Sequence, residues 1–172
     1  LSALKRNYKT PRRSEINKTL EDALIPSETD EKPVESVVVG IASDYTIKKI
    51  PLKNFNLSNK DVVGASSSEV LTTAIETKTD GQVMFFSNLG NCLRMTVGDM
   101  PEIRYRDNGV TLSQLFAEAQ KGETPVSAFV LAKDAEPQGE LLIYTRQGLI
   151  KRSEWKEYQL LKQVFQGYKG KD

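Results

Sequence analysis

Three stretches of this 172-residue chain superpose on one another without a gap, and this internal repeat limits the fold more than any other feature. Each stretch has a short apolar run, a few turn residues and a second run. The three are VVGIASDYTIKKIPLKNF from Val38, VMFFSNLGNCLRMTVGDM from Val83 and LLIYTRQGLIKRSEWKEY from Leu141. Two such runs around a short turn are typical of a β-hairpin. The repeat therefore predicts three successive hairpins.

We call each set of equivalent positions in the three superposed stretches a column. In the turn of the predicted hairpins one column holds Tyr45, Gly90 and Gly148. Glycine suits this place because hairpin turns often require a positive φ, which glycine adopts without a steric penalty. Tyr45 departs from the pattern. If the turn requires a positive φ, we expect the first copy to be strained or to have a different shape.

A period of roughly 45 to 50 residues leaves room for two further strands per hairpin, which is the size of a four-stranded propeller-type blade. We therefore expect an all-β, propeller-like array of about three four-stranded blades, at about residues 35–80, 81–133 and 134–172. The further strands are predicted at 62–65 with 70–75, and at 110–116 with 126–131. Residues 111–119 also fit a short helix, because their apolar side chains have helical spacing, at Leu112, Leu115, Phe116 and Ala119.

The first 34 residues differ in composition from the repeats. Residues 1–18 carry six basic side chains and a single acidic one, Glu15. The following stretch is acidic and contains Pro26 and Pro33, which is typical of a solvated linker. We predict a short helical segment and an acidic linker over 1–34, and a separate domain over 35–172. The alternative is an irregular arm that packs on the main domain. Because the chain begins with Leu1, we interpret it as a piece of a longer protein.

The composition excludes several kinds of chemistry. The chain has no histidine and one cysteine, Cys92, so it cannot hold a Ser-His-Asp triad, an internal disulfide or a zinc knuckle. Phosphate-binding and dinucleotide-binding glycine motifs are absent. We expect no catalytic residue, no metal site and no cofactor in this chain. The single thiol fits a cytoplasmic protein, and no apolar stretch is long enough to span a membrane.

Apolar side chains recur in three further columns of the repeat. We assign two of these columns to the core, because blade-to-blade packing explains them more simply than stacking on bases does. In one column Cys92 stands with two isoleucines, which predicts a buried, unreactive thiol. The other two columns are Leu52, Val97 and Trp155, and Phe55, Met100 and Tyr158.

A basic residue also recurs once per repeat, four positions after the turn column, as Lys49, Arg94 and Arg152. If neighbouring blades align these side chains, they form a belt of positive charge suited to a duplex phosphate backbone, without reading bases. The alternative is that they are solvating charges on sheet edges, where lysine blocks unwanted strand pairing. Residues 37–172 hold 17 basic and 16 acidic side chains. This near-neutral balance favours a modest affinity for DNA.

Several motifs resemble the A chain of bacterial type IIA DNA topoisomerases. The segment TPRRSEI (10–16) is similar to the Arg-Arg-Thr-Glu-Ile stretch that closes the coiled-coil arm of that family. Three further segments are similar to successive blades of the C-terminal β-pinwheel of that family. They are DYTIKKIPLKNF (44–55), GNCLRMTVGDMPEIRYRDNGVTLSQLF (90–116) and GLIKRSEWKEY (148–158). The resemblance implies the end of the arm plus a linker over 1–34, and a partial β-pinwheel over 35–172.

The resemblance also implies a function. In the family the pinwheel binds duplex DNA for an A2B2 enzyme that passes one duplex through another, and the catalytic tyrosine lies upstream of the part present here. ATP and Mg²⁺ act through the B subunit, so the implied partners are duplex DNA, the B subunit, and a second A subunit. The DNA-binding candidates carried over by position are Lys48, Lys49, Lys53, Arg94, Lys151, Arg152 and Lys156, with Arg104 and Arg106 added.

Two branches of the family are distinguished by a glycine- and arginine-rich box that follows the first hairpin in gyrase. The matching stretch here, NLSNKDVVG (56–64), has one lysine and no glycine pair. The run PEIRYRDNGVTLSQ (101–114) resembles topoisomerase IV of low-GC Gram-positive bacteria. Topoisomerase IV is therefore favoured. The alternatives are a gyrase with a decayed box, and a protein-interaction propeller that does not bind DNA.

Overall fold

The computed structural model describes residues 33–58, 70–133, 135, 138–159 and 162–169. The chain divides into two units, Leu1–Pro33 and Val34–Asp172, and the structure below is that of the second. The predicted arm, the acidic linker and the TPRRSEI segment lie outside the described residues, as does the strand predicted at 62–65.

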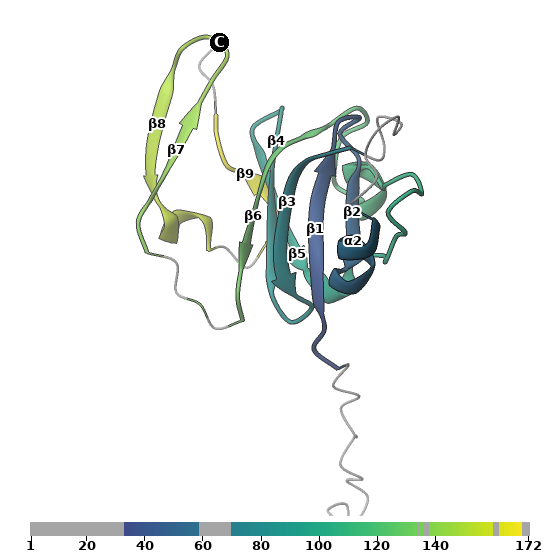
Figure 1. The fold of residues 1–172 in the computed structure, drawn as a ribbon. Helices are drawn as coiled ribbons and strands as arrows, with labels where there is room; N and C mark the ends of the chain where they lie inside the picture. Colours follow the sequence, from purple (N-terminus) through teal and green to yellow (C-terminus); the bar gives the residue numbers. More distant parts are fainter. Residues whose placement is uncertain (1–32, 59–69, 134, 136–137, 160–161, 170–172) are drawn as a thin grey trace, which may run out of the picture. The chain divides into compact units, whose positions relative to one another are not determined.

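Three antiparallel hairpins form the framework of the second unit (Figure 1). They are β1 (Ser36–Ala42) with β2 (Ile47–Pro51), β4 (Gln82–Ser87) with β5 (Asn91–Thr96), and β7 (Glu140–Tyr144) with β8 (Ile150–Glu154). The strands pair in one common register, with Lys49 opposite Val39, Arg94 opposite Met84 and Arg152 opposite Leu142. The predicted repeat of hairpins is confirmed residue by residue.

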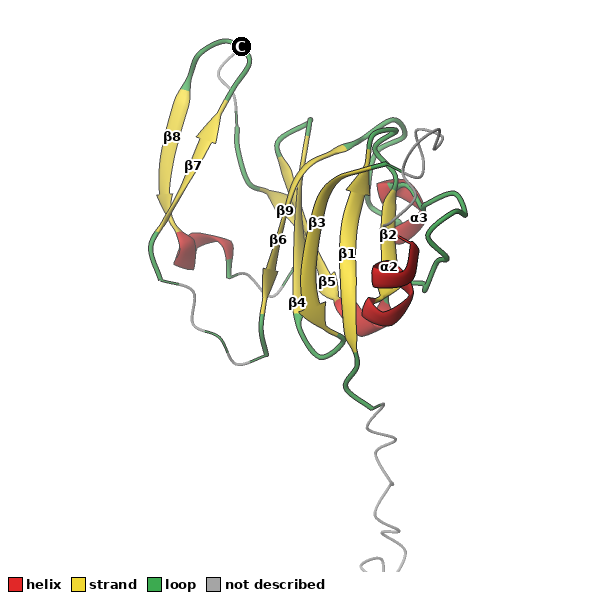
Figure 2. Ribbon diagram, viewed as in Figure 1, coloured by secondary structure: helices red, strands yellow, loops and turns green. Residues whose placement is uncertain are grey.

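A short helical segment follows each hairpin (Figure 2). These segments are the α-helix α2 (Leu52–Ser58) and the 3-10 helices η2 (Val97–Asp99) and η3 (Trp155–Tyr158). Each begins at the same column of the repeat. Among the described helices, none is long and apolar enough to cross a membrane.

The three hairpin turns have one shape, including the turn that contains Tyr45. The φ angles in the turn column are 63° at Tyr45, 81° at Gly90 and 83° at Gly148. The N–H of each donates to the carbonyl oxygen three residues earlier, at 2.9, 3.0 and 3.0 Å. The first copy therefore keeps the turn and holds a tyrosine in the left-handed region, where a side chain is strained. Of the two outcomes we expected, strain applies and a different shape does not.

A third strand lies beside each of the first two hairpins. β3 (Leu71–Lys78) pairs with β1, and β6 (Pro125–Leu131) pairs with β4. These strands correspond to the predictions at 70–75 and 126–131. The prediction of a strand at 110–116 is wrong, because α3 (Leu112–Leu115) forms there and buries Leu112 in the core. The helical spacing was the better guide to this segment.

The outer edge of each of the first two sheets comes from the following repeat. β9 (Val164–Gln166), which follows the third hairpin, pairs with β5. Likewise, Glu102 and Val110, which follow the second hairpin, bridge to Lys49 and Ile47 of β2. We call the sheet of β2, β1 and β3 sheet A, that of β6, β4, β5 and β9 sheet B, and the pair of β7 and β8 sheet C. The predicted blade over 81–133 therefore omits a strand of its own sheet.

Two buried clusters join the sheets face to face. One contains Val39 of sheet A with Phe85 and Leu93 of sheet B. The other contains Met84 and Cys92 from the opposite face of sheet B, with side chains that follow or belong to sheet C, namely Leu141, Trp155 and Tyr158. The columns that we assigned to packing lie in these clusters at Val97, Met100, Trp155 and Tyr158.

Candidate nucleic-acid interface

The two lysines of β2 predicted to contact DNA are buried. The ammonium group of Lys48 donates to the carbonyl oxygen of Tyr105 at 2.7 Å, and it lies 6.0 Å from the centre of the tyrosine ring. The ammonium group of Lys49 lies 3.3 Å from the carbonyl oxygen of Gly98. Both side chains hold main chain of the second repeat against sheet A. Neither presents its charge on the surface that the predicted belt required.

In sheets A and B, the cationic column lies on the face that turns toward the next sheet. Lys49 is opposite Val39, whose side chain belongs to the cluster between sheets A and B. Arg94 is opposite Met84, which belongs to the cluster between sheets B and C, and it is half-buried. The column therefore recurs at inter-sheet faces and does not line up along an outer rim. Strand alternation groups these residues on one face, but it does not say what covers that face.

Arg94 also lies close to the single thiol. Burial raises the pKa of Cys92 to about 12, and the positive charge of Arg94 lowers it by a smaller amount. A thiol with such a pKa stays protonated at neutral pH, where thiolate is the reactive form. Cys92 is buried, as the sequence predicted.

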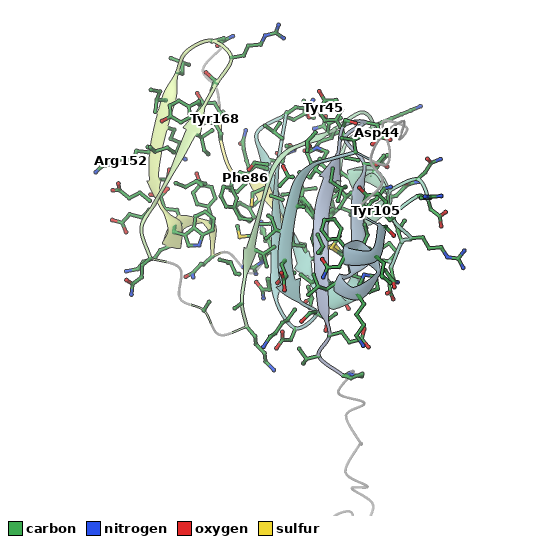
Figure 3. The ribbon with its side chains drawn as sticks, viewed as in Figure 1. Asp44, Tyr45, Phe86, Tyr105, Arg152 and Tyr168 are labelled. Atoms are coloured by element: carbon green, nitrogen blue, oxygen red, sulfur yellow. The ribbon has the colours of Figure 1, made fainter. Side chains whose placement is uncertain are left out.

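The third hairpin places its basic residues in different surroundings. Lys151 is half-buried, with its ammonium group 3.4 Å from the carbonyl oxygen of Gly167 and 5.8 Å from the ring centre of Tyr158. Arg152 on β8 is exposed (Figure 3). Its guanidinium forms an ion pair of 3.0 Å with Glu140. An exposed pair of this kind contributes little to stability, so the guanidinium can exchange its carboxylate for another anion.

Three of the predicted cationic residues lie on two segments that meet at the outer edge of sheet A. The segment from Glu102 to Val110 runs beside β2, where Ile103 N–H donates to the carbonyl oxygen of Lys49 at 2.9 Å. Within it Tyr105 is buried, and its ring lies 6.0 Å from that of Phe55 on α2. This contact brings α2 beside the segment. Lys53, two residues before Phe55, and Arg104 and Arg106, the neighbours of Tyr105 in the sequence, are exposed, and we call these three residues the basic edge.

The same edge recurs in part on the following sheets. Lys156 occupies in η3 the column that Lys53 occupies in α2, and both side chains are exposed. Lys162, which precedes β9, is also exposed and stands 58 residues after Arg104, the offset between the second and third repeats. Sequence reasoning missed Lys162 because the columns were followed only to the end of each hairpin. Extending the same offset beyond the hairpin would have found it.

Comparison with known proteins identifies A subunits of DNA topoisomerase 4 and of DNA gyrase among the relatives of the chain. The chain is 30% identical over 158 residues to the A subunit of DNA topoisomerase 4 from Bacillus subtilis, covering 92% of this chain and 19% of that protein. It is 27% identical over 153 residues to the A subunit of DNA topoisomerase 4 from Staphylococcus aureus, covering 89% and 19%. The A subunit of DNA gyrase from Staphylococcus epidermidis is 26% identical over 160 residues, covering 89% and 17%. No family model matches the chain.

A solved structure shares the fold. The crystal structure of the C-terminal domain of DNA topoisomerase IV superposes with a TM-score of 0.63 and 26% sequence identity, covering 77% of this chain and 40% of that one. The predicted all-β pinwheel fold is therefore confirmed. The chain spans about a fifth of the length of the relatives that it matches.

Proposed function

Because the chain is a homologue of the A subunits of bacterial type II DNA topoisomerases, with the fold of the C-terminal domain of topoisomerase IV, we propose that it binds duplex DNA through the basic edge. The observation that carries this proposal is the grouping of Lys53, Arg104 and Arg106 around the contact between Phe55 and Tyr105. Guanidinium and ammonium groups at a sheet edge suit phosphate oxygens, and such contacts carry no base information.

The proposed surface differs from the one that the sequence alone suggested. Lys156 and Lys162 extend it toward the later sheets, and Arg152 joins it when its guanidinium leaves Glu140. The buried groups of Lys48 and Lys49 serve it indirectly, since Lys48 holds Tyr105, which stands between the two arginines. Arg94 and Lys151 are half-buried, and we place them behind this surface.

The proposal extends to the whole enzyme by homology. We infer a role in an A2B2 topoisomerase of the cytoplasm, in which ATP and Mg²⁺ act through the B subunit, whereas this chain needs no cofactor of its own. Of the two branches, topoisomerase IV is supported by the absence of a glycine pair from residues 56–64. The expected role is to hold a duplex during strand passage, decatenation and relaxation.

The test measures the affinity of the chain for a linear duplex over a range of salt concentrations. Each phosphate contact contributes a slope of about −0.9 in a plot of log K against log salt. The substitutions Arg104→Glu and Arg106→Glu should weaken binding alike on unrelated sequences and make the slope shallower. Lys78→Glu is the control, because Lys78 is exposed on β3, at the opposite edge of sheet A.

Three results would count against the basic edge. Affinity that does not change with salt would contradict phosphate contacts. Equal losses in Arg104→Glu and Lys78→Glu would show an effect of net charge alone. A chain that does not bind DNA at low salt, and that retains a specific protein instead, would favour the protein-interaction alternative.

A further inference from the structure

Tyr45, at the turn end of sheet A (Figure 3), is the one residue other than glycine with a positive φ in the described part of the chain. Its equivalents Gly90 and Gly148 form the same turn, so the turn itself does not require a tyrosine. A side chain in this conformation is unfavourable. Backbone strain of this kind is concentrated where a side chain has a function.

Packing within the chain does not account for the tyrosine. Its side chain is 56% exposed, and its ring and hydroxyl have no ring contact, hydrogen bond or ion pair with any described residue. Both faces of sheet A are nevertheless covered. Val39 is buried on the face toward sheet B, and Val38 and Ile50 are buried on the other face. The exposure of the ring is therefore not that of an unfinished repeat.

The turn lies against the segment that carries the two arginines of the basic edge. Val110, near the end of this segment, exchanges two backbone hydrogen bonds with Ile47, of 2.7 and 2.9 Å. A Cβ on Gly109 would lie 2.5 Å from the hydroxyl oxygen of Thr46, so the two main chains are in close contact. The main chain at Tyr45 is thus less than about 30 Å from that of the nearer arginine. One helical turn of DNA is about 34 Å long, so a single duplex can reach both.

The second repeat shows where a side chain of this column points. At Gly90 a Cβ would lie 2.5 Å from the carbonyl oxygen of Tyr168, which follows the outer strand of sheet B. Tyr168 stands 58 residues after Val110, which is the offset between the second and third repeats. A side chain of this column therefore points toward the outer edge of its sheet. In sheet A, that edge is the one beside the basic edge residues.

On the basis of the proposed function, we propose that Tyr45 stacks on an unstacked base of a duplex that the basic edge holds. Proteins that bind strands with open bases combine cationic groups for the phosphates with aromatic rings for the base faces. Arg104, Arg106 and Tyr45 are such a combination. The turn is held in place by Asp44, which accepts hydrogen bonds from the N–H and the hydroxyl of Thr46 at 3.1 and 2.6 Å. The ring therefore favours duplex that is locally open, as at a bulge.

The test compares the affinity of the chain for a fully paired duplex and for the same duplex with one unpaired adenine. We expect the bulged duplex to bind about tenfold more tightly. Tyr45→Gly should abolish this preference, whereas Tyr45→Phe keeps the ring and should retain it. Tyr144→Ala is the control and should also retain it, because it removes an exposed tyrosine of the third hairpin. With 2-aminopurine as the unpaired base, binding should quench its fluorescence, and Tyr45→Gly should remove the quenching.

Stability separates a contact with DNA from a role in folding. Tyr45→Gly should not lower the urea midpoint, because glycine adopts the positive φ without strain. A lower midpoint would show that the ring stabilises the fold, and it would overturn the proposal. Equal affinity of the unchanged chain for the two duplexes, or a preference that survives Tyr45→Gly, would overturn it too.

These outcomes differ from a failure of the proposed function. Arg104→Glu and Arg106→Glu should weaken binding to both duplexes by similar factors and so keep the preference for the bulged one. An unchanged chain that binds both duplexes equally, with an affinity that depends on salt, would leave the basic edge in place and exclude only the role of Tyr45. A chain that binds neither duplex would contradict both proposals.

Discussion

The ammonium group of Lys48 donates a hydrogen bond of 2.7 Å to the carbonyl oxygen of Tyr105, so a side chain of the first repeat holds the main chain of the second. Lys48 is fully buried. In the second repeat its column holds Leu93 and in the third Lys151. A buried lysine bonded in this way fixes one arrangement of the segment that carries Arg104 and Arg106.

We therefore expect Lys48→Ala to lower the free energy of unfolding by about 2 to 4 kcal/mol, because it removes a charged hydrogen bond and leaves a cavity. DNA affinity should fall in the same variant as the segment loosens. Urea denaturation measures the first effect and a binding titration the second. Lys78→Ala, at an exposed position of the same sheet, should change stability by less than about 0.5 kcal/mol.

The two turn glycines should respond differently to alanine. Both have a positive φ, which costs a residue with a side chain about 1 kcal/mol or more. At Gly90 a Cβ would also lie 2.5 Å from the carbonyl oxygen of Tyr168, whereas at Gly148 it meets no atom of the described residues within 4 Å. We expect Gly90→Ala to cost roughly 3 kcal/mol and Gly148→Ala about 1. Equal losses of stability for the two variants in urea denaturation would show that the main chain at Tyr168 moves easily to make room for the Cβ.

The carboxyl of Glu123 should make the free energy of unfolding depend on pH. Burial raises the pKa of its carboxyl, but hydrogen bonds from Ser87, the N–H of Gln120 and Asn91 outweigh burial, so the pKa lies below its usual value. A carboxyl whose pKa is lower in the folded chain than in the unfolded chain stabilises the fold at pH values above its unfolded pKa of about 4.3. That stabilisation is lost as the pH falls through the pKa of the folded chain.

The corresponding experiment compares Glu123→Gln with the unchanged chain in urea at several pH values. The loss of stability should be greatest at neutral pH and should shrink below about pH 4. Glu118→Gln, at an exposed position of the same loop, is the control and should show little change. A loss for Glu123→Gln that is the same at every pH would mean that the charge of the carboxylate contributes nothing.

Ser153 offers a stabilising substitution. Its hydroxyl oxygen is buried without a hydrogen-bond partner in the described structure, and the equivalent residues of the other repeats are Ile50 and Met95. A buried polar group without a partner is unfavourable by about 1 to 3 kcal/mol. Ser153→Val should therefore raise the free energy of unfolding by about 1 kcal/mol. A loss of stability would indicate a partner for the hydroxyl, such as an ordered water molecule.

The hairpins could be predicted from sequence because their determinants are local. The gap-free superposition of Val38, Val83 and Leu141 fixed the pairing register, since strand alternation and turn position set it together. The turn at Tyr45 also followed the repeat, although the residue is unfavourable there. In that turn Asp44 accepts a hydrogen bond from the N–H of Thr46 at 3.1 Å. In the other copies the hydroxyl oxygens of Ser87 and Thr145 accept the equivalent hydrogen bonds, from the N–H groups of Asn91 and Leu149.

The candidate nucleic-acid interface was harder to predict because it depends on contacts between distant residues. No local pattern shows that Val110 bonds to Ile47 or that Phe165 pairs with Cys92. These pairings decide which face of a sheet is covered, and hence why Lys49 is buried while Arg104 is exposed. A charged residue that recurs at one column of the repeat indicates equivalent positions on the three hairpins. Only the tertiary structure showed whether each of these positions is exposed to water.

The exchange of outer strands between repeats has a consequence for synthesis and for evolution. Sheet B is incomplete until β9 has left the ribosome, although its central hairpin was made about 70 residues earlier. The outer edge of each of the first two hairpins therefore stays unpaired until the following repeat has been synthesised. For the same reason a deletion of one repeat would harm two sheets at once, so gains and losses of repeats must join chain ends that restore both.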